Sequence, residues 1–337
     1  MKNNILQYTT ILIFLFICII FPPDSVAQAI IADHNCVPEF YSIPISNIQD
    51  IQENCNIFYG HSSHGSQIIT GISMIENESS IYYSPMISEY DADLGSQGDI
   101  SWVLPTRTYL DAHPECNVIM WSWCGGASDN TEEGINIYLD SMNTLEIDYP
   151  FVDFIYMTGH LDGTGPTGNL YRSNNQIRSY CLTNNKILFD FADIESYDPD
   201  FNYYPDESDE CAWCSDWCSV HLCPECGGCL HSQCFNCYQK GKAFWWMMAK
   251  VRGWEVSPRC CDNWGLPGDS NSDNKINLVD ILFLIAFKYN NPPGPPNPTG
   301  CNELLDEDGN NAINLLDILY LIDHLYSNPP GPAPVCP

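Results

Sequence analysis

The chain has 337 residues, enough for one sizeable domain and a smaller module. Its formal net charge is −31, with 43 Asp and Glu residues against 12 Lys and Arg residues. Nucleic acids and anionic membranes attract positive surfaces, so this charge argues against both as partners.

The first residues predict a signal peptide. The positively charged start MKNN precedes an apolar run over 11–21, and Ala27-Gln28-Ala29 resembles an export cleavage site, so we expect cleavage after Ala29. The sequence after the signal peptide contains no run of about 18 apolar residues, so we expect no membrane span there. We therefore expect a secreted, extracellular protein.

Short apolar runs alternate with helix-like segments between residues 30 and 261. The candidate strands are 56–60, 117–123, 153–159 and 186–194, and the candidate helices lie near 65–77, 131–147, 168–184 and 238–253. Near-continuous apolar strands separated by helices are typical of a parallel sheet that is buried on both faces. The pattern predicts an α/β domain, a three-layer α/β/α sandwich with a parallel sheet.

Reactive side chains follow the predicted strands. Ser62 and Ser63 come after the first strand, Gly125 after the second, and His160 and Asp162 after the third. Loops at the carboxyl ends of parallel strands build the active site, so we expect these residues to gather in one crevice. A serine hydroxyl becomes a useful nucleophile when a histidine takes its proton and N–H groups stabilise the oxyanion.

The order of these blocks resembles the SGNH (GDSL-like) hydrolases over roughly 50–255. The resemblance implies a serine esterase in which His231, just before the last predicted helix, is the base. Ser62 stands at the serine of the family's Gly-Asp-Ser motif, and Ser63 is the serine of an H-x-S-x-G turn. It also implies that N–H groups near Gly125 stabilise the oxyanion with help from His160.

Two positions depart from the family pattern. Gly159-His160-Leu161-Asp162 stands where the family has Gly-x-Asn-Asp, so the amide donor is missing and His160 is the predicted substitute. Gly228 stands three residues before His231, where the family has Asp. We expect Asp209, Asp216 or another carboxylate to orient the ring, unless the site works as a dyad.

Three other interpretations stay open. His61 and His64, with His160 and Asp162, could hold zinc in a metallohydrolase. The α/β domain could instead be a non-catalytic extracellular binding module. The two serines could also be simple helix N-caps.

Eight cysteines crowd into residues 211–237. Their C-x-x-C spacings fit either disulfides or tetrahedral zinc. Disulfides persist in an oxidising compartment, so the predicted export favours disulfides and keeps zinc as the alternative.

Two twelve-residue loops near the C-terminus predict calcium sites. Oxygen ligands recur at positions 1, 3, 5, 9 and 12, with a backbone carbonyl at position 7, the spacing that wraps one calcium ion. The predicted ligands of the two ions are Asp269, Asn271, Asp273, Lys275, Asn277 and Asp280, then Asp306, Asp308, Asn310, Ala312, Asn314 and Asp317. At position 6 both loops carry Asn (Asn274 and Asn311), which tolerates the left-handed backbone after glycine.

The duplicated loop, ended by Asp and followed by an apolar helix, resembles type I dockerin modules over roughly 262–337. The resemblance implies a small all-α calcium-binding module that docks onto a cohesin-type partner through Leu278, Val279, Leu315 and Leu316. Dockerins mostly tether carbohydrate-active enzymes, so it also implies an acylated polysaccharide as the substrate.

Overall fold

The computed structural model describes residues 28–255, 266–289, 305–309, 313–327 and 330–334. The chain divides into two compact units, one up to Gly253 and the other from Trp254. Almost all of the predicted signal peptide lies outside the described residues.

The first unit contains a six-stranded parallel sheet in the order β1-β6-β5-β4-β2-β3. The strands are β1 (Ile30–Ala32), β2 (Asn56–His61), β3 (Met86–Asp91), β4 (Val118–Trp121), β5 (Asp153–Met157) and β6 (Ile187–Phe189). The four strands expected from the sequence are present, three of them with shorter bounds and β2 one residue longer, and two edge strands, β1 and β3, are added. The predicted parallel α/β architecture is confirmed.

The helices alternate with the strands. They are α1 (Ile45–Asn54), α2 (Ser66–Glu78), α3 (Val103–Ala112), α4 (Glu132–Asp148), α5 (Asn169–Thr183), α6 (Phe191–Ser196), α7 (Ala212–Val220) and α8 (Cys234–Val251). Short 3-10 turns cover His34–Cys36, Pro38–Ser42, Ser80–Tyr82 and Gly165–Thr167. Crossovers between parallel strands are right-handed, so this order puts α1 and α2 on one face and α3, α4 and α5 on the other. The result is consistent with three α/β/α layers.

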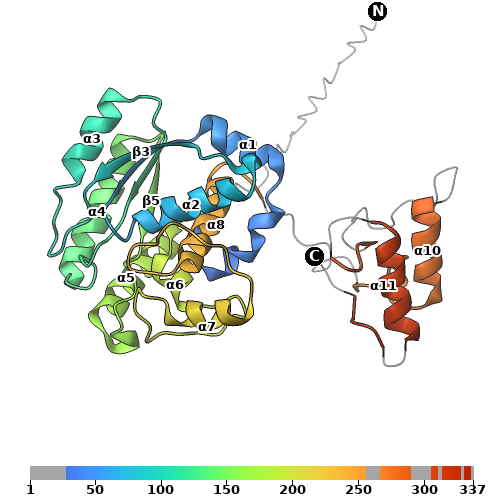
Figure 1. Ribbon diagram of the computed structural model, residues 1–337. Helices are drawn as coiled ribbons and strands as arrows, with labels where there is room; N and C mark the ends of the chain where they lie inside the picture. The colour runs from blue at the N-terminus through green and yellow to red at the C-terminus, as the bar shows by residue number, and fades with distance from the viewer. Residues whose placement is uncertain (1–27, 256–265, 290–304, 310–312, 328–329, 335–337) are drawn as a thin grey trace, which may run out of the picture. The chain divides into compact units, whose positions relative to one another are not determined.

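Helices α2 and α8 pack closely against each other (Figure 1). Gly71 of α2 meets Gly241 of α8, and a Cβ atom at Gly71 would lie 1.9 Å from the carbonyl oxygen of Cys237. Only glycine therefore allows this approach.

The strand order reverses at β2, whose neighbours β3 and β4 both follow it in the chain. Such a switch point opens a crevice at the carboxyl end of the strand, because the next two crossovers leave on opposite faces. Residues 62–65, which join β2 to α2, lie at this position.

The second unit contains two helices among its described residues, α10 (Leu278–Tyr289) and α11 (Leu315–Tyr326). Their apolar core consists of Ile281, Leu284, Leu305, Ile318 and Leu321. None of the described helices, in either unit, is long and apolar enough to cross a membrane.

Candidate functional site

His64 lies at the centre of the side chains at the β2 switch point. Its Nε2 atom is 2.9 Å from a carboxylate oxygen of Asp209, and its Nδ1 atom is 3.3 Å from Sγ of Cys124. His64 is buried, whereas Cys124 and Asp209 are partly exposed. A carboxylate, an imidazole and a thiol thus form one hydrogen-bonded chain, the arrangement in which an oriented base activates a nucleophile.

Two further histidines stack on His64. The ring of His160 lies 3.6 Å from the ring of His64 at an angle of 2°, and the ring of His231 lies 4.4 Å away at 11°. If the rings of His160 and His231 lay on the same face of the His64 ring, they would overlap each other. They therefore lie on opposite faces of His64. The loops after β2 and β5 and the segment before α8 therefore meet here, as the sequence predicted for these three segments.

The surroundings of His64 keep its ring neutral. Burial lowers the pKa of His64, the hydrogen bond with Asp209 partly opposes this, and the neighbouring His160 and His231 lower it further. A neutral ring bonded to a carboxylate carries its proton on Nε2, so Nδ1 is left as an acceptor. The thiol of Cys124 can then donate to Nδ1, as a general base requires.

The two serines have different partners. Ser63 Oγ is 3.2 Å from Sγ of Cys124 and so lies in the His64 cluster. Ser62 is turned towards Asp93, which accepts both its hydroxyl and its backbone N–H, the latter at 2.7 Å. Within residues 28–255, no hydrogen bond joins His231 to either serine. Neither serine caps α2, whose N-cap residue is Gly65.

The other predicted residues lie around this cluster. Gly125 follows Cys124 with a φ of 77°, the left-handed backbone that glycine adopts easily. Asp162 accepts a hydrogen bond of 2.9 Å from Ser128 and further bonds from Thr164. Burial opposes ionisation of Asp162, but these bonds outweigh it and leave its pKa lowered.

The zinc ligands expected at His61, His64, His160 and Asp162 do not form one group. His61 bonds Glu89 at 2.9 Å. Among the described residues, the histidine-containing groups with close ligand atoms are His64, Asp209 and His231, and separately Asp33, His34 and Asp193.

A buried ion pair supports the loops that carry the stacked rings. Lys240 Nζ lies 2.6 Å from Oε1 of Glu195, and both side chains are fully buried. Glu195 also accepts a hydrogen bond of 2.8 Å from the backbone N–H of Leu161. Lys240 donates a second hydrogen bond to the side chain of Gln67. The amide of Gln67 in turn donates to the carbonyl of Leu230 at 2.6 Å. Leu161 follows His160 and Leu230 precedes His231, so one network holds both loops.

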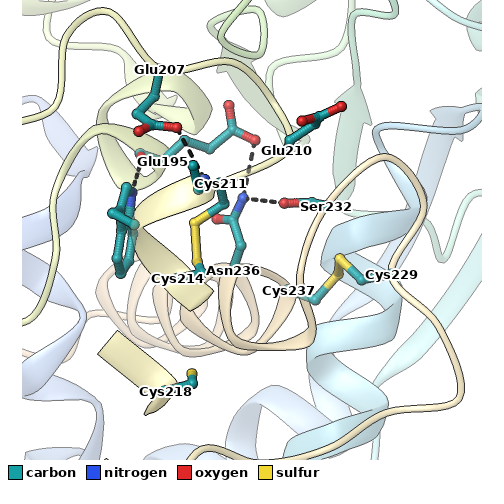
Figure 2. Close-up of a disulfide and its surroundings, with 12 residues drawn as sticks. Glu195, Glu207, Glu210, Cys211, Cys214, Cys218, Cys229, Ser232, Asn236 and Cys237 are labelled. Atoms are coloured by element: carbon teal, nitrogen blue, oxygen red, sulfur yellow. Dashed lines mark hydrogen bonds between the residues drawn. A yellow bond between two sulfur atoms is a disulfide. The ribbon is translucent and has the colours of Figure 1, made fainter. Parts of the chain in front are cut away.

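The cysteine-rich segment is braced by four disulfides, Cys211–Cys214, Cys218–Cys223, Cys226–Cys234 and Cys229–Cys237. Figure 2 shows the bridges Cys211–Cys214 and Cys229–Cys237 close to Glu195 and Asn236. The side-chain amide of Asn236 donates a hydrogen bond of 2.7 Å to Ser232 Oγ. The disulfide interpretation of this segment is thus the one that the structure has, and paired sulfurs offer no thiolate to a metal. His231 lies between Cys229 and Cys234, so two of the bridges fasten its loop to the start of α8.

The predicted calcium loops carry clustered carboxylates. Asp306, Asp308 and Asp317 have oxygens that all lie within 4.8 Å of one another, and Asp317 is fully buried. In the first loop, Asp269 and Asp280 are buried. Burial raises the pKa of Asp280, and the negative charges of Asp269 and Asp273 raise it further. Grouped buried carboxylates are costly without a cation, so these residues fit calcium. Asn274 has the expected left-handed φ of 64°. Asn310, Asn311 and Ala312 of the second loop lie outside the described residues.

Comparisons with known proteins identify no relative: neither a family model, nor a curated protein, nor a solved structure matches the chain. The resemblances to SGNH hydrolases and to type I dockerins therefore rest on the residues quoted above.

Sequence reasoning gave Cys124 no chemical role and considered His64 only as a zinc ligand. A usable signal was present, because Cys124-Gly125-Gly126 directly follows a predicted strand, at the same sheet edge as His64. Asp209 was one of the carboxylates considered as the residue that orients His231, whereas its hydrogen bond is to His64.

Proposed function

We propose that this chain is a secreted acyl hydrolase in which Cys124 is the nucleophile and His64 is the general base. The observation that carries the proposal is the pair of contacts on His64, 3.3 Å to Cys124 Sγ and 2.9 Å to Asp209. The neutral ring favoured by its surroundings is the form that accepts a proton.

The reaction runs in two steps. His64 Nδ1 takes the thiol proton of Cys124, the sulfur attacks the ester carbonyl carbon, and the carbonyl electron pair moves onto the oxygen. When that pair returns, the C–O bond to the alcohol breaks and the leaving oxygen takes the proton from His64. Water then attacks the thioester, again with His64 as base, which releases the acid and restores the thiol.

The oxyanion can be stabilised by the turn before α2. The backbone N–H groups of Ser63, His64 and Gly65 donate no hydrogen bond to any acceptor within residues 28–255. They precede the first turn of a 13-residue helix, whose N-terminus carries partial positive charge. Free donors are therefore available beside the proposed nucleophile.

Ser63 has a secondary role in this proposal. When the thiol of Cys124 donates to His64, the Ser63 hydroxyl is left to donate to the sulfur, 3.2 Å away. That bond holds the sulfur in place and stabilises developing negative charge on it.

The wider context is proposed from the sequence. The four disulfides indicate an oxidising, extracellular environment. The two predicted calcium loops support a dockerin-like module that tethers the hydrolase to a cohesin-type partner. An acylated polysaccharide is the substrate class that such tethering favours.

Variants of the full chain test the proposal on 4-nitrophenyl acetate and on acetylated xylan. We expect Cys124→Ala to abolish hydrolysis, His64→Gln to lower the rate by about 10²- to 10⁴-fold, and Ser63→Ala to keep measurable activity. His113→Gln is the matched control, because His113 bonds Glu115 in an exposed pair outside this cluster. If Ser63→Ala abolishes activity and Cys124→Ala retains it, the serine is the nucleophile and the present assignment is wrong.

Thiol labelling gives a second test. The other free cysteines among the described residues, Cys36, Cys55, Cys116 and Cys181, are buried, and burial raises the pKa of each thiol. Iodoacetamide should therefore modify the Cys124 peptide of the native protein well before theirs, with parallel loss of activity. Activity that survives complete modification of Cys124 contradicts the proposal.

A zinc-dependent hydrolase is the second candidate, supported by the close ligand atoms of His64, Asp209 and His231. Those three side chains would hold the ion, which would supply an acidified water for hydrolysis. Metal analysis of the purified protein, with Asp209→Asn for comparison, separates the candidates: stoichiometric zinc that is lost in the variant favours this one.

A further inference from the structure

A cavity of about 230 Å³ lies among the loop that follows β5, helices α5 and α6, and the irregular stretch before α7. Its walls include Leu161 and Asp162, which follow His160, and Glu207, which lies two residues before Asp209. Asp162 pairs with Ser208 in a β-bridge, and the N–H of Gly163 donates to the Glu207 carbonyl at 3.1 Å. The two loops that carry His160 and Asp209 therefore also form this cavity.

Three tyrosines, Tyr171, Tyr197 and Tyr203, line the cavity and give it its chemical character. Tyr171 and Tyr203 are 37% and 49% exposed, so the cavity is open to solvent at these rings, and none of the three hydroxyls has a hydrogen-bond partner within residues 28–255. The ring of Tyr197 stacks between His34, at 3.6 Å, and Tyr203, at 4.8 Å, which fixes the directions of two of the hydroxyls. Burial, and then the neighbouring Tyr171 and Tyr197, raises the pKa of Tyr203, so its hydroxyl stays protonated and can donate.

The charge of the walls selects against anions. Asp162, Asp193 and Glu207 supply three carboxylates against one guanidinium, Arg178; Asp193 is paired with His34, so the acidic excess comes from Asp162 and Glu207. Arg178 is already held by Asp190 through two hydrogen bonds of 2.6 and 2.7 Å, so it has little charge to offer a ligand. Acidic groups together with free hydroxyls suit a neutral ligand that has many hydroxyl groups of its own.

We propose that this tyrosine cavity binds a neutral sugar ring of the ester substrate, next to the acyl group that Cys124 attacks. Its volume is below the ~300–1,000 Å³ typical of pockets for drug-sized ligands, which suits one small ring. Tyr197 is covered on both ring faces and offers its hydroxyl, whereas Tyr171 and Tyr203 can offer a flat apolar ring face as well, the combination that a sugar presents in return. The location beside the acyl group rests on the proposed function, whereas the sugar site itself does not.

Isothermal titration calorimetry on the full-length secreted protein tests the site. The probes are unacylated xylotetraose, cellotetraose and mannotetraose, with tetragalacturonate as the acidic comparison; none of them contains an ester bond, so no turnover interferes. We expect at least one neutral oligosaccharide to bind, and tetragalacturonate to bind at least about tenfold more weakly.

Tyr171→Phe and Tyr203→Phe remove single hydroxyls and keep the rings. Each should weaken binding by about 2- to 12-fold, the loss expected for one hydrogen bond. Tyr83→Phe is the matched control, an exposed tyrosine outside the cavity, and should leave binding unchanged. Absence of binding to all three neutral probes, tighter binding of tetragalacturonate, or equal affinity of all the variants overturns the proposal.

The result is independent of the hydrolase test. Sugar binding that depends on Tyr203, in a protein that cleaves no ester, retains the site and removes the proposed function. Cleavage of 4-nitrophenyl acetate without sugar binding retains the proposed function and contradicts the proposed sugar site.

Discussion

At the scale of single residues, the ionisation of His64 controls the proposed chemistry. Burial and the two stacked imidazoles lower the pKa of His64 below its ordinary value of about 6.5, and the Asp209 hydrogen bond works in the opposite direction. A lowered pKa means that the neutral base persists into mildly acidic solution. We therefore expect the acid limb of the kcat/KM profile to lie below pH ~6.5.

The variant Asp209→Asn tests the direction in which Asp209 shifts the pKa of His64. The variant loses the interaction that raises the pKa of His64, so the acid limb should move to still lower pH while kcat falls. Profiles of 4-nitrophenyl acetate hydrolysis between pH 4 and 8 measure both changes, with Asp148→Asn, an exposed carboxylate paired with Arg107, as the control. An acid limb that moves upward in Asp209→Asn contradicts the assignment of His64 as base.

From the sequence we could predict which side chains lie at this edge of the sheet, but not which of them form hydrogen bonds with one another. Ser63, His160 and His231 could be assigned to one crevice because each adjoins the end of a predicted strand or the start of a predicted helix. Asp209 lies in an irregular stretch between α6 and α7, where no periodicity fixes the path of the chain. Which imidazole it meets is therefore decided by tertiary contacts such as the bridge between Asp162 and Ser208.

At the scale of elements, the central strands could be predicted and the edge strands could not. The central strands β4 and β5 are almost wholly buried and read as apolar runs. Edge strand β3, with the sequence MISEYD, is largely exposed and mixes polar with apolar residues, while β1 is only three residues long. Neither has the periodicity or the length that identifies a strand.

The ion pair that joins α6 to α8 yields a prediction about stability. Lys240→Met leaves the fully buried Glu195 without its cation, so we expect a loss of about 3–5 kcal/mol in the free energy of unfolding. Arg252→Met breaks the partly exposed pair with Asp50 and should cost less than about 1 kcal/mol. Urea unfolding of both variants measures the contrast, and equal losses contradict the structural role given to Lys240.

At the scale of the whole molecule, the disulfides and the acidic loops lie in different parts of the chain. All four disulfides among the described residues lie within 211–237, in the unit that ends at Gly253, and the clustered carboxylates of the calcium loops lie in the unit that begins at Trp254. The apolar core of the second unit, formed around α10 and α11, is small, so we expect this unit to need a bound cation for its stability. The two units should therefore respond separately to removal of calcium.

Differential scanning calorimetry of the full chain should show this separation. With excess calcium we expect two transitions, and EGTA should lower or abolish the one that belongs to the second unit while leaving the α/β transition in place. Asp317→Asn removes a fully buried carboxylate from the second loop and should weaken the response to calcium, because Asp317 lies with Asp306 and Asp308 in one cluster. Asp323→Asn, on the same helix but outside the loop, is the matched control. Identical thermograms with calcium and with EGTA mean that the clustered carboxylates bind no calcium, because a ligand that binds only the folded state must raise its melting temperature.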